Sequence, residues 1–373
     1  MNRQIKTLRS LHSTAFNLKR NCVLVDGART PFCRANQEFD GIWSYDLQST
    51  AISGLLKRNP SLNTEEIERV VCGTTIHEAN TSNVAREAAT AAGVPFTTPC
   101  NTVTLACISS NVAVNQVVTS IENGDIDIGI AGGTESTSDM PLRHPRKTRE
   151  WVIKHGQRVN GLTGKKGLLQ ALDKYQSKSK TRVGKMFDML GMDVPGITEF
   201  STGETMGHFS DRLTAAFGVS REEQDEFAYK SHLNALNAQQ AGHFTDVLKV
   251  FVPGRDLPVD RDMGVKPNLE KARTLKPAFV KPHGTATAAN SSFLTDGASA
   301  CLLMAEDVAL EKGFKPLAYI RESVVISRNP ADELQANPEY KTICLMNFKL
   351  FELFFRKFSL YFLVLPTPPA LFC

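Results

Sequence analysis

Asn101-Thr-Val-Thr-Leu-Ala-Cys107-Ile-Ser-Ser110 carries a short β-prone run directly into the start of a helix. The next residues, 111–121, have apolar side chains at positions that predict a buried helix. The unpaired N–H groups and the positive dipole end of its first turn would favour a thiolate at Cys107. Cys107 is therefore a candidate nucleophile. The alternative is a small buried hydrophobe, because free cysteine is among the most buried residue types.

The region around this segment alternates between two kinds of pattern. Residues 23–25, 70–72 and 126–130 are strand-like, whereas 51–56 is helical. Such alternation predicts an α/β fold with parallel-type strand pairing and helices on the faces of the sheet.

Composition is consistent with a soluble α/β enzyme, since 42% of the 373 residues are hydrophobic and 22% are charged. Eight cysteines are too few over this length for a disulfide scaffold. No C-x-x-C or His/Cys pair with zinc spacing occurs among them, so we expect a reducing compartment and no metal.

Further sequence blocks precede and follow the cysteine in a fixed order. They are Val25–Phe32, Thr81–Ala89, Ile128–Ser136, Glu204–Gly207 and Lys281–Ala300. In that order and at those separations they resemble the thiolase family, over about residues 20 to 335. The resemblance implies a thiolase-like layered αβαβα fold whose second half is incomplete.

We divide the chain on this basis. The expected parts are a mitochondrial transit peptide (1–20), an N-terminal thiolase half (21–140), a loop domain with a basic amphipathic insert (141–270), the start of a C-terminal half (271–338) and an aberrant tail outside the family pattern (339–373). The first part has five Lys or Arg and no acid, which is typical of a transit peptide, although a surface helix remains the alternative.

The resemblance also implies a reaction, the cleavage of 3-ketoacyl-CoA by CoA through an acyl-enzyme on Cys107, with CoA as a substrate and no cofactor. Ser292 would contact the pantetheine amide, and Met206 would line its channel. Each has a purely structural alternative, because a serine can bond a turn and a methionine before glycine is usually core.

Other family motifs do not occur in these 373 residues. None of the eight histidines lies in a Gly-His-Pro motif, and neither Cys344 nor Cys373 is followed by glycines. We therefore keep a second hypothesis, a catalytically silent thiolase-fold chain that acts at most as a subunit partner. The tail holds seven phenylalanines after residue 340, but its apolar run is too short to span a bilayer.

Residues 141–190 carry thirteen Lys or Arg against three Asp or Glu, while the whole chain has a net charge of +4. Val183, Met186, Phe187 and Leu190 follow a helical apolar stripe, which indicates a basic amphipathic hairpin on an anionic inner-membrane lipid surface. The alternative is a solvated loop that meets the phosphates of CoA. We do not expect nucleic-acid binding, because the segment lacks a recognised module and interleaved aromatic residues.

The insert and Phe200–Arg212 most resemble the thiolases of mitochondrial long-chain fatty-acid oxidation. That similarity implies a chain in the matrix or on the inner membrane, a homo-oligomer, and a hydratase/dehydrogenase α subunit as partner.

Overall fold

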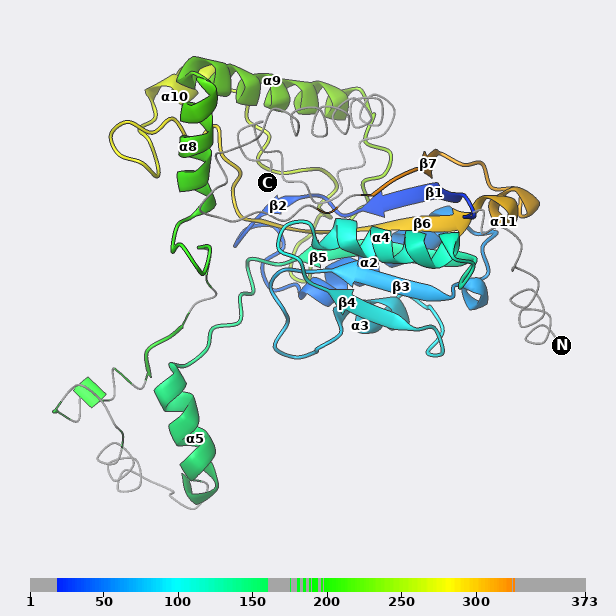
Figure 1. Ribbon diagram of the computed structural model, residues 1–373, viewed down its shortest axis with the longest axis horizontal. Coiled ribbons are helices and arrows are strands. Elements are labelled where there is room, and N and C mark those ends of the chain that lie inside the picture. The colour runs from blue at the N-terminus through cyan, green and yellow to red at the C-terminus, as the bar shows by residue number, and fades with distance from the viewer. Residues whose placement is uncertain are drawn as a thin grey trace. The chain divides into compact units, whose positions relative to one another are not determined.

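The computed structural model describes residues 19–159, 198–323 and 325, together with scattered positions between 175 and 196. Residues 1–18 of the expected transit peptide and the whole of the expected tail, 339–373, lie outside the described residues. Two compact units divide the chain, 140–197 and the remainder. The larger unit contains one mixed sheet with helices on both faces (Figure 1).

The sheet has the strand order β4-β3-β5-β6-β1-β7, with the short β2 paired to β6. Its strands are β1 (Cys22–Arg29), β2 (Cys33–Arg34), β3 (Arg69–Gly73), β4 (Cys100–Val103), β5 (Ile128–Glu135), β6 (Thr295–Ala305) and β7 (Ala318–Ile320). The parallel-type prediction holds only for β3 with its neighbours β4 and β5. Strand β6 runs antiparallel to β5 and β1, and β7 runs antiparallel to β1.

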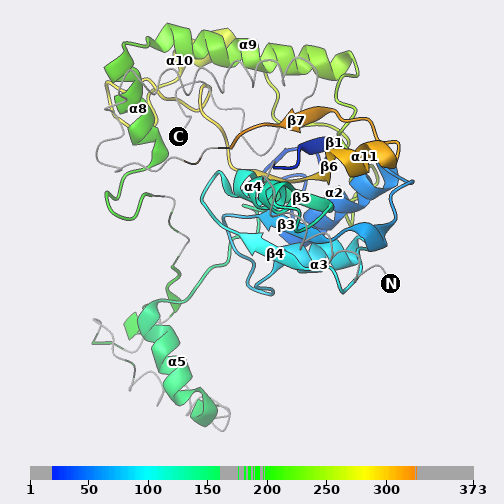
Figure 2. The ribbon, with the colours of Figure 1, turned by 45° about the vertical axis from the view of Figure 1, so that its right-hand side comes forward.

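The described helices are α2 (Ser44–Arg58), α3 (Val84–Ala91), α4 (Ser109–Glu122), α5 (Arg146–Val159), α8 (Met206–Phe217), α9 (Arg221–Gln240), α10 (Leu269–Thr274) and α11 (Glu306–Glu311), with a 3₁₀ turn at Thr64–Glu66. The predicted helix 111–121 thus lies within α4. Helices α8, α9 and α10 form a group beside the sheet (Figure 2).

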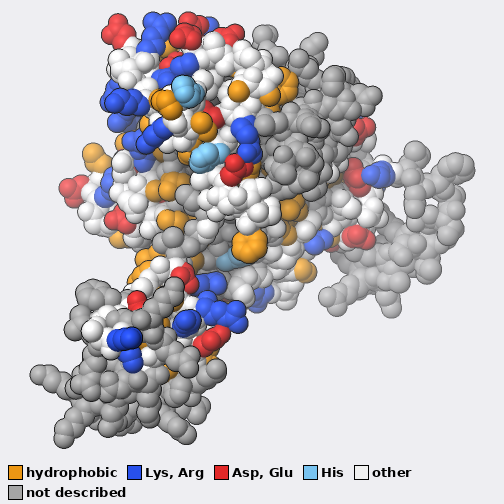
Figure 3. All heavy atoms as spheres, turned by 60° about the vertical axis from the view of Figure 1, so that its left-hand side comes forward, with side chains coloured by type: hydrophobic (Ala, Val, Ile, Leu, Met, Phe, Trp, Pro, Cys, Tyr) orange, Lys and Arg blue, Asp and Glu red, His pale blue; other side chains and the backbone are white. Residues whose placement is uncertain are grey.

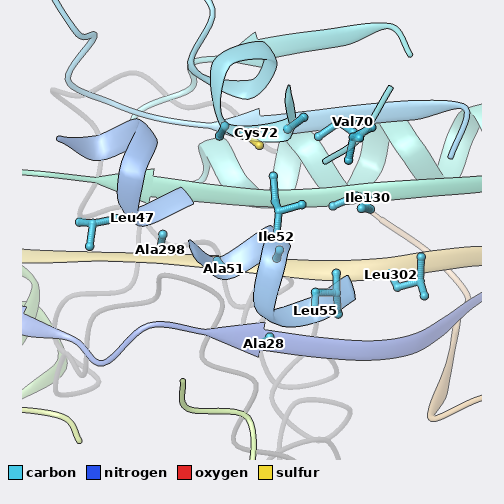
Figure 4. Close-up of a cluster of buried hydrophobic side chains, with 14 of the residues drawn as sticks. Ala28, Leu47, Ala51, Ile52, Leu55, Val70, Cys72, Ile130, Ala298 and Leu302 are labelled. Carbon is cyan, nitrogen blue, oxygen red and sulfur yellow. The ribbon is translucent and has the colours of Figure 1, made fainter. Parts of the chain in front are cut away.

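Two apolar clusters hold the sheet between its helices. On one face, Ile52 and Leu55 of α2 pack against Val70, Ile130 and Leu302 of three strands (Figure 4). The other cluster is formed by α4 with alternate residues of the same strands. Its members include Val71, Ala113, Val117, Ile121, Ala131, Cys301 and Leu303. Successive residues of a strand point to opposite faces, so Leu302 and Leu303 belong to different clusters.

Strand β6 corrects the expected domain division. We expected 271–338 to begin a second half, but Ala298–Ala305 is paired with β1 on one side and β5 on the other. It is an interior strand of the first sheet. An apolar run does not identify its partner strands, because pairing between residues about 170 apart leaves no local pattern.

The expected loop domain 141–270 is also corrected, since only 140–197 separates as a unit of its own. A buried arginine ties residues 244–263 to the sheet. The Arg29 guanidinium donates to Asp262 at 2.6 and 2.8 Å and to Asp246 at 3.2 Å. Leu248 N–H also donates to the carbonyl of Arg29. Breaking one partner of such a buried pair is strongly destabilising.

The smaller unit contains α5. Tyr175 is buried beside this helix, where its hydroxyl lies 2.6 Å from that of Thr148. Val183, Met186 and Phe187 of the predicted apolar stripe lie outside the described residues, and Leu190 is exposed. Among the helices of the described ranges, none combines the length and apolar character that a membrane crossing needs.

Candidate active site around Cys107

Cys107 lies in the turn that joins β4 to α4, two residues before the first residue of the helix. No side chain caps α4, although the Ser109 N–H already donates to the carbonyl of Ala106. The positive end of the helix dipole would still favour a negative charge nearby. The predicted location at a helix start is therefore confirmed, and the side chain is exposed.

Two glycines allow α4 to begin so close to the sheet. A Cβ atom on Gly73 of β3 would collide with the backbone of Ser109, and one on Gly133 would collide with the hydroxyl of Ser110. Any larger residue would displace the start of the helix, and with it Cys107.

The Ser109 hydroxyl makes two hydrogen bonds within the turn that contains Cys107. It donates to the carbonyl of Ala106 at 2.6 Å and accepts the N–H of Leu105 at 2.8 Å. Ala106, directly before the cysteine, has a φ of 44°. A residue other than glycine in this left-handed region is strained, and such strain persists where the surroundings determine the conformation.

Burial distinguishes Cys107 from the other described cysteines. Burial raises the pKa of the Cys22 and Cys301 thiols to about 12, and it also raises the pKa of Cys100. Burial likewise raises the pKa of the Cys33 and Cys72 thiols. Among the described cysteines only Cys107 is exposed, so the alternative of a buried hydrophobe is wrong for this residue.

Met206 is the first residue of α8, and 40% of it is exposed. The Ser292 hydroxyl donates to the carbonyl of its neighbour Phe293 at 3.0 Å, a local turn bond. Within the described ranges, no hydrogen bond joins either residue to the other or to Cys107. Their roles at a pantetheine channel stay predictions.

The described residues contain no group of three His, Cys, Asp or Glu side chains placed to hold a metal ion. What the site offers is an exposed thiol at the start of a helix. That arrangement suits covalent acyl transfer.

The N-terminal domain of the thiolase family matches residues 22–307. The chain belongs to the thiolase family. The match runs through all of β6, in agreement with the single sheet. The predicted family and its α/β fold are confirmed.

Two relatives of this chain support the same family. The mitochondrial trifunctional enzyme subunit beta of Bos taurus is 48% identical over 324 residues, 87% of this chain and 65% of that protein. The probable 3-ketoacyl-CoA thiolase of Caenorhabditis elegans is 45% identical over 338 residues, 90% of this chain and 72% of that protein. The chain thus spans about two thirds of the length of these relatives.

One solved structure extends the comparison to the fold. The acetyl-CoA acetyltransferase of Bacillus anthracis superimposes with a TM-score of 0.67 at 27% identity, over 82% of this chain and 70% of that one.

Proposed function

We propose that this chain is a 3-ketoacyl-CoA thiolase, an acetyl-CoA C-acyltransferase of mitochondrial fatty-acid β-oxidation. The observation that carries the proposal is Cys107, exposed at the start of α4 within a thiolase domain. The names of the relatives at 45–48% identity support the substrate class and the compartment.

The Cys107 sulfur attacks the keto carbon of 3-ketoacyl-CoA, the bond to the acetyl carbon breaks, and the thiol proton passes to that carbon, so that acetyl-CoA leaves. Free CoA then takes the shortened acyl group from the cysteine, and its thiol proton returns to Cys107. The covalent intermediate divides a difficult cleavage into two steps of lower barrier. Amides at the start of α4 would stabilise the negative charge that develops on the oxygen.

Both acyl-CoA and CoA are substrates here, and no cofactor takes part. Met206, half-exposed at the start of α8, would line the pantetheine channel. Ser292 would contact a pantetheine amide, which requires its hydroxyl to leave the carbonyl of Phe293.

The proposed partners follow from the relatives. The name subunit beta implies an α-subunit partner. We propose that this partner is a hydratase/dehydrogenase and that the chain also self-associates into a homo-oligomer. Arg143, Arg146, Lys147 and Arg149, which are exposed at and before the start of α5, would hold the chain near anionic lipid of the inner membrane. Figure 3 shows blue Lys and Arg side chains on this unit.

The test is the mass of the cysteine peptides after incubation with octanoyl-CoA. The acyl–sulfur bond of CoA breaks, a new one forms to Cys107, and the thiol proton passes to CoA. We expect an octanoyl adduct on Cys107 that is absent in Cys107→Ser and retained in Cys100→Ser. No adduct, or an adduct on another cysteine, would refute acyl transfer by this chain.

A further inference from the structure

The strained turn before Cys107 is held partly from outside its own segment. The Ala106 carbonyl accepts the hydroxyl of Thr75 at 3.1 Å, in addition to its bonds from Ser109. Thr75 belongs to the loop that follows β3, about thirty residues earlier in the chain. A hydrogen bond from another loop therefore helps to fix the carbonyl that precedes the nucleophile.

That loop is held in turn by Glu135, the last residue of β5. One carboxylate oxygen accepts the N–H of Thr75 at 2.8 Å, and the other accepts the N–H of Ile76 at 3.1 Å. Strands β3 and β5 are parallel neighbours with Gly73 opposite Gly133, so their carboxyl ends meet at one edge of the sheet. Burial raises the pKa of Glu135 above its ordinary value, and hydrogen bonds from Thr75 and from the Ile76 N–H offset only part of that shift.

A second connection joins the same two loops. The Thr104 hydroxyl donates to the carbonyl of Thr74 at 2.7 Å. Its oxygen also lies 2.8 Å from Nε2 of His77. Because a hydroxyl has one hydrogen, the His77 ring nitrogen is the donor in this second bond. Thr74 N–H further donates to the carbonyl of Val103.

We propose that Glu135 is a positioning residue for Cys107, acting through Thr75 and the carbonyl of Ala106. This inference rests on the proposed function of Cys107 as the acyl-accepting nucleophile. Glu135 makes no contact with the sulfur. It fixes the 74–77 loop, the loop fixes the strained peptide before the cysteine, and that peptide sets where the thiol points.

Misplacement of the Cys107 thiol should slow only those reactions in which the other reactant is bound to the protein. Transfer of an acyl group from bound acyl-CoA depends on the orientation of the thiol, because small misplacements of reacting groups cost up to about 10²-fold in rate. Alkylation by a small, freely diffusing reagent depends mainly on exposure. Loss of positioning should lower the rate of acyl transfer but not the rate of alkylation, whereas local unfolding would change both rates.

The experiment measures both rates in the full chain. We compare Glu135→Gln and Thr75→Val with Glu68→Gln, whose carboxylate accepts the N–H of Asp127 at the opposite end of the same two strands. Thr75→Ser keeps the hydroxyl and serves as the rescue variant. Octanoyl transfer to Cys107 is followed across octanoyl-CoA concentrations, and iodoacetamide labelling of Cys107 is followed in parallel.

We expect the saturating rate of octanoyl transfer to fall by about tenfold or more in Glu135→Gln and Thr75→Val. The half-saturating concentration and the labelling rate should stay within about threefold, and Thr75→Ser and Glu68→Gln should behave as wild type. Unchanged transfer in either Glu135→Gln or Thr75→Val, or an equal fall in transfer and labelling, would overturn the proposal. If Glu135→Gln does not fold, unchanged transfer in Thr75→Val still overturns it, because Glu135 is proposed to act through Thr75. A wild-type chain that accepts no octanoyl group would overturn the proposed function itself, and this inference with it.

Discussion

At the scale of single residues, the sequence predicted the position of Cys107 at the start of a helix but not the residues that hold it there. Cys107 could be predicted because its signal is local: a β-prone run, a cysteine and a helix follow one another. Glu135 stood in a recognised block without an assigned role. Glu135 accepts two hydrogen bonds from residues about sixty positions earlier in the chain, and no local sequence pattern predicts contacts over such a separation.

The first prediction concerns thiol reactivity. Iodoacetamide should modify Cys107 before Cys22, Cys72 or Cys301, because a thiolate is the reactive form and burial disfavours it in the other three. Peptide mass mapping after short exposures gives the order of modification. Earlier modification of any of the three buried cysteines would contradict the exposure that the structure gives them.

The second prediction concerns acid stability. Burial raises the pKa of Asp26, but hydrogen bonds from Arg58, Asn59 and the Gly27 N–H outweigh it, so the net pKa lies below its ordinary value. The stabilisation is therefore present above the unfolded-state pKa of about 3.9 and is lost as pH falls through the lower folded-state pKa.

Melting temperatures of wild type and Asp26→Asn between pH 6 and pH 2.5 test this direction. We expect the difference between the two proteins to shrink as the solution becomes more acid. The exposed Asp256→Asn is the matched control. A difference in melting temperature that stays constant down to the lowest pH would show that the charge of the Asp26 carboxylate contributes nothing to stability.

At the scale of elements, helix α4 was predicted correctly and strand β6 was placed in the wrong sheet. Helices are encoded by spacing along one segment, whereas the strands on either side of β6 are chosen by packing with distant parts of the chain. Both faces of β6 are buried, so its sequence has no polar alternation that would indicate an edge.

The third prediction tests the interior position of β6. Leu303→Ala should lower the free energy of unfolding by about 2–5 kcal/mol, because it opens a cavity beneath α4. Leu310→Ala on the exposed side of α11 is the control and should change stability by about 0.5 kcal/mol or less. Chemical denaturation followed by circular dichroism gives both values. Equal effects of the two substitutions would be incompatible with a β6 packed on both faces.

At the scale of the whole molecule, the family and its α/β fold were predictable from ordered motifs, while the boundaries of the compact units were not. The segment 140–197 separates as a unit, yet residues 244–263 return to the sheet through Arg29. Arg29 lies more than 200 residues before its two aspartate partners, so no pattern among neighbouring residues predicts this pairing.

The fourth prediction concerns lipid association. Sedimentation of the full chain with vesicles should increase with cardiolipin content and decrease with salt, because each Lys or Arg near an anionic surface contributes about 1 kcal/mol. The double substitution Arg146→Gln, Lys147→Gln should weaken binding, whereas Lys266→Gln, Lys271→Gln should not. Equal sedimentation with neutral and anionic vesicles would rule out the electrostatic contribution.

The central claim, that Cys107 holds the acyl group covalently before CoA takes it, is tested most directly by isotope exchange. The chain is incubated with octanoyl-CoA and labelled CoA, and the label that appears in octanoyl-CoA is measured over time. An acyl-enzyme requires exchange without any further substrate, since the first CoA leaves before the second enters. We predict exchange by wild type and by Cys100→Ser, and none by Cys107→Ser. Exchange that persists in Cys107→Ser, or is absent from wild type, would contradict the account.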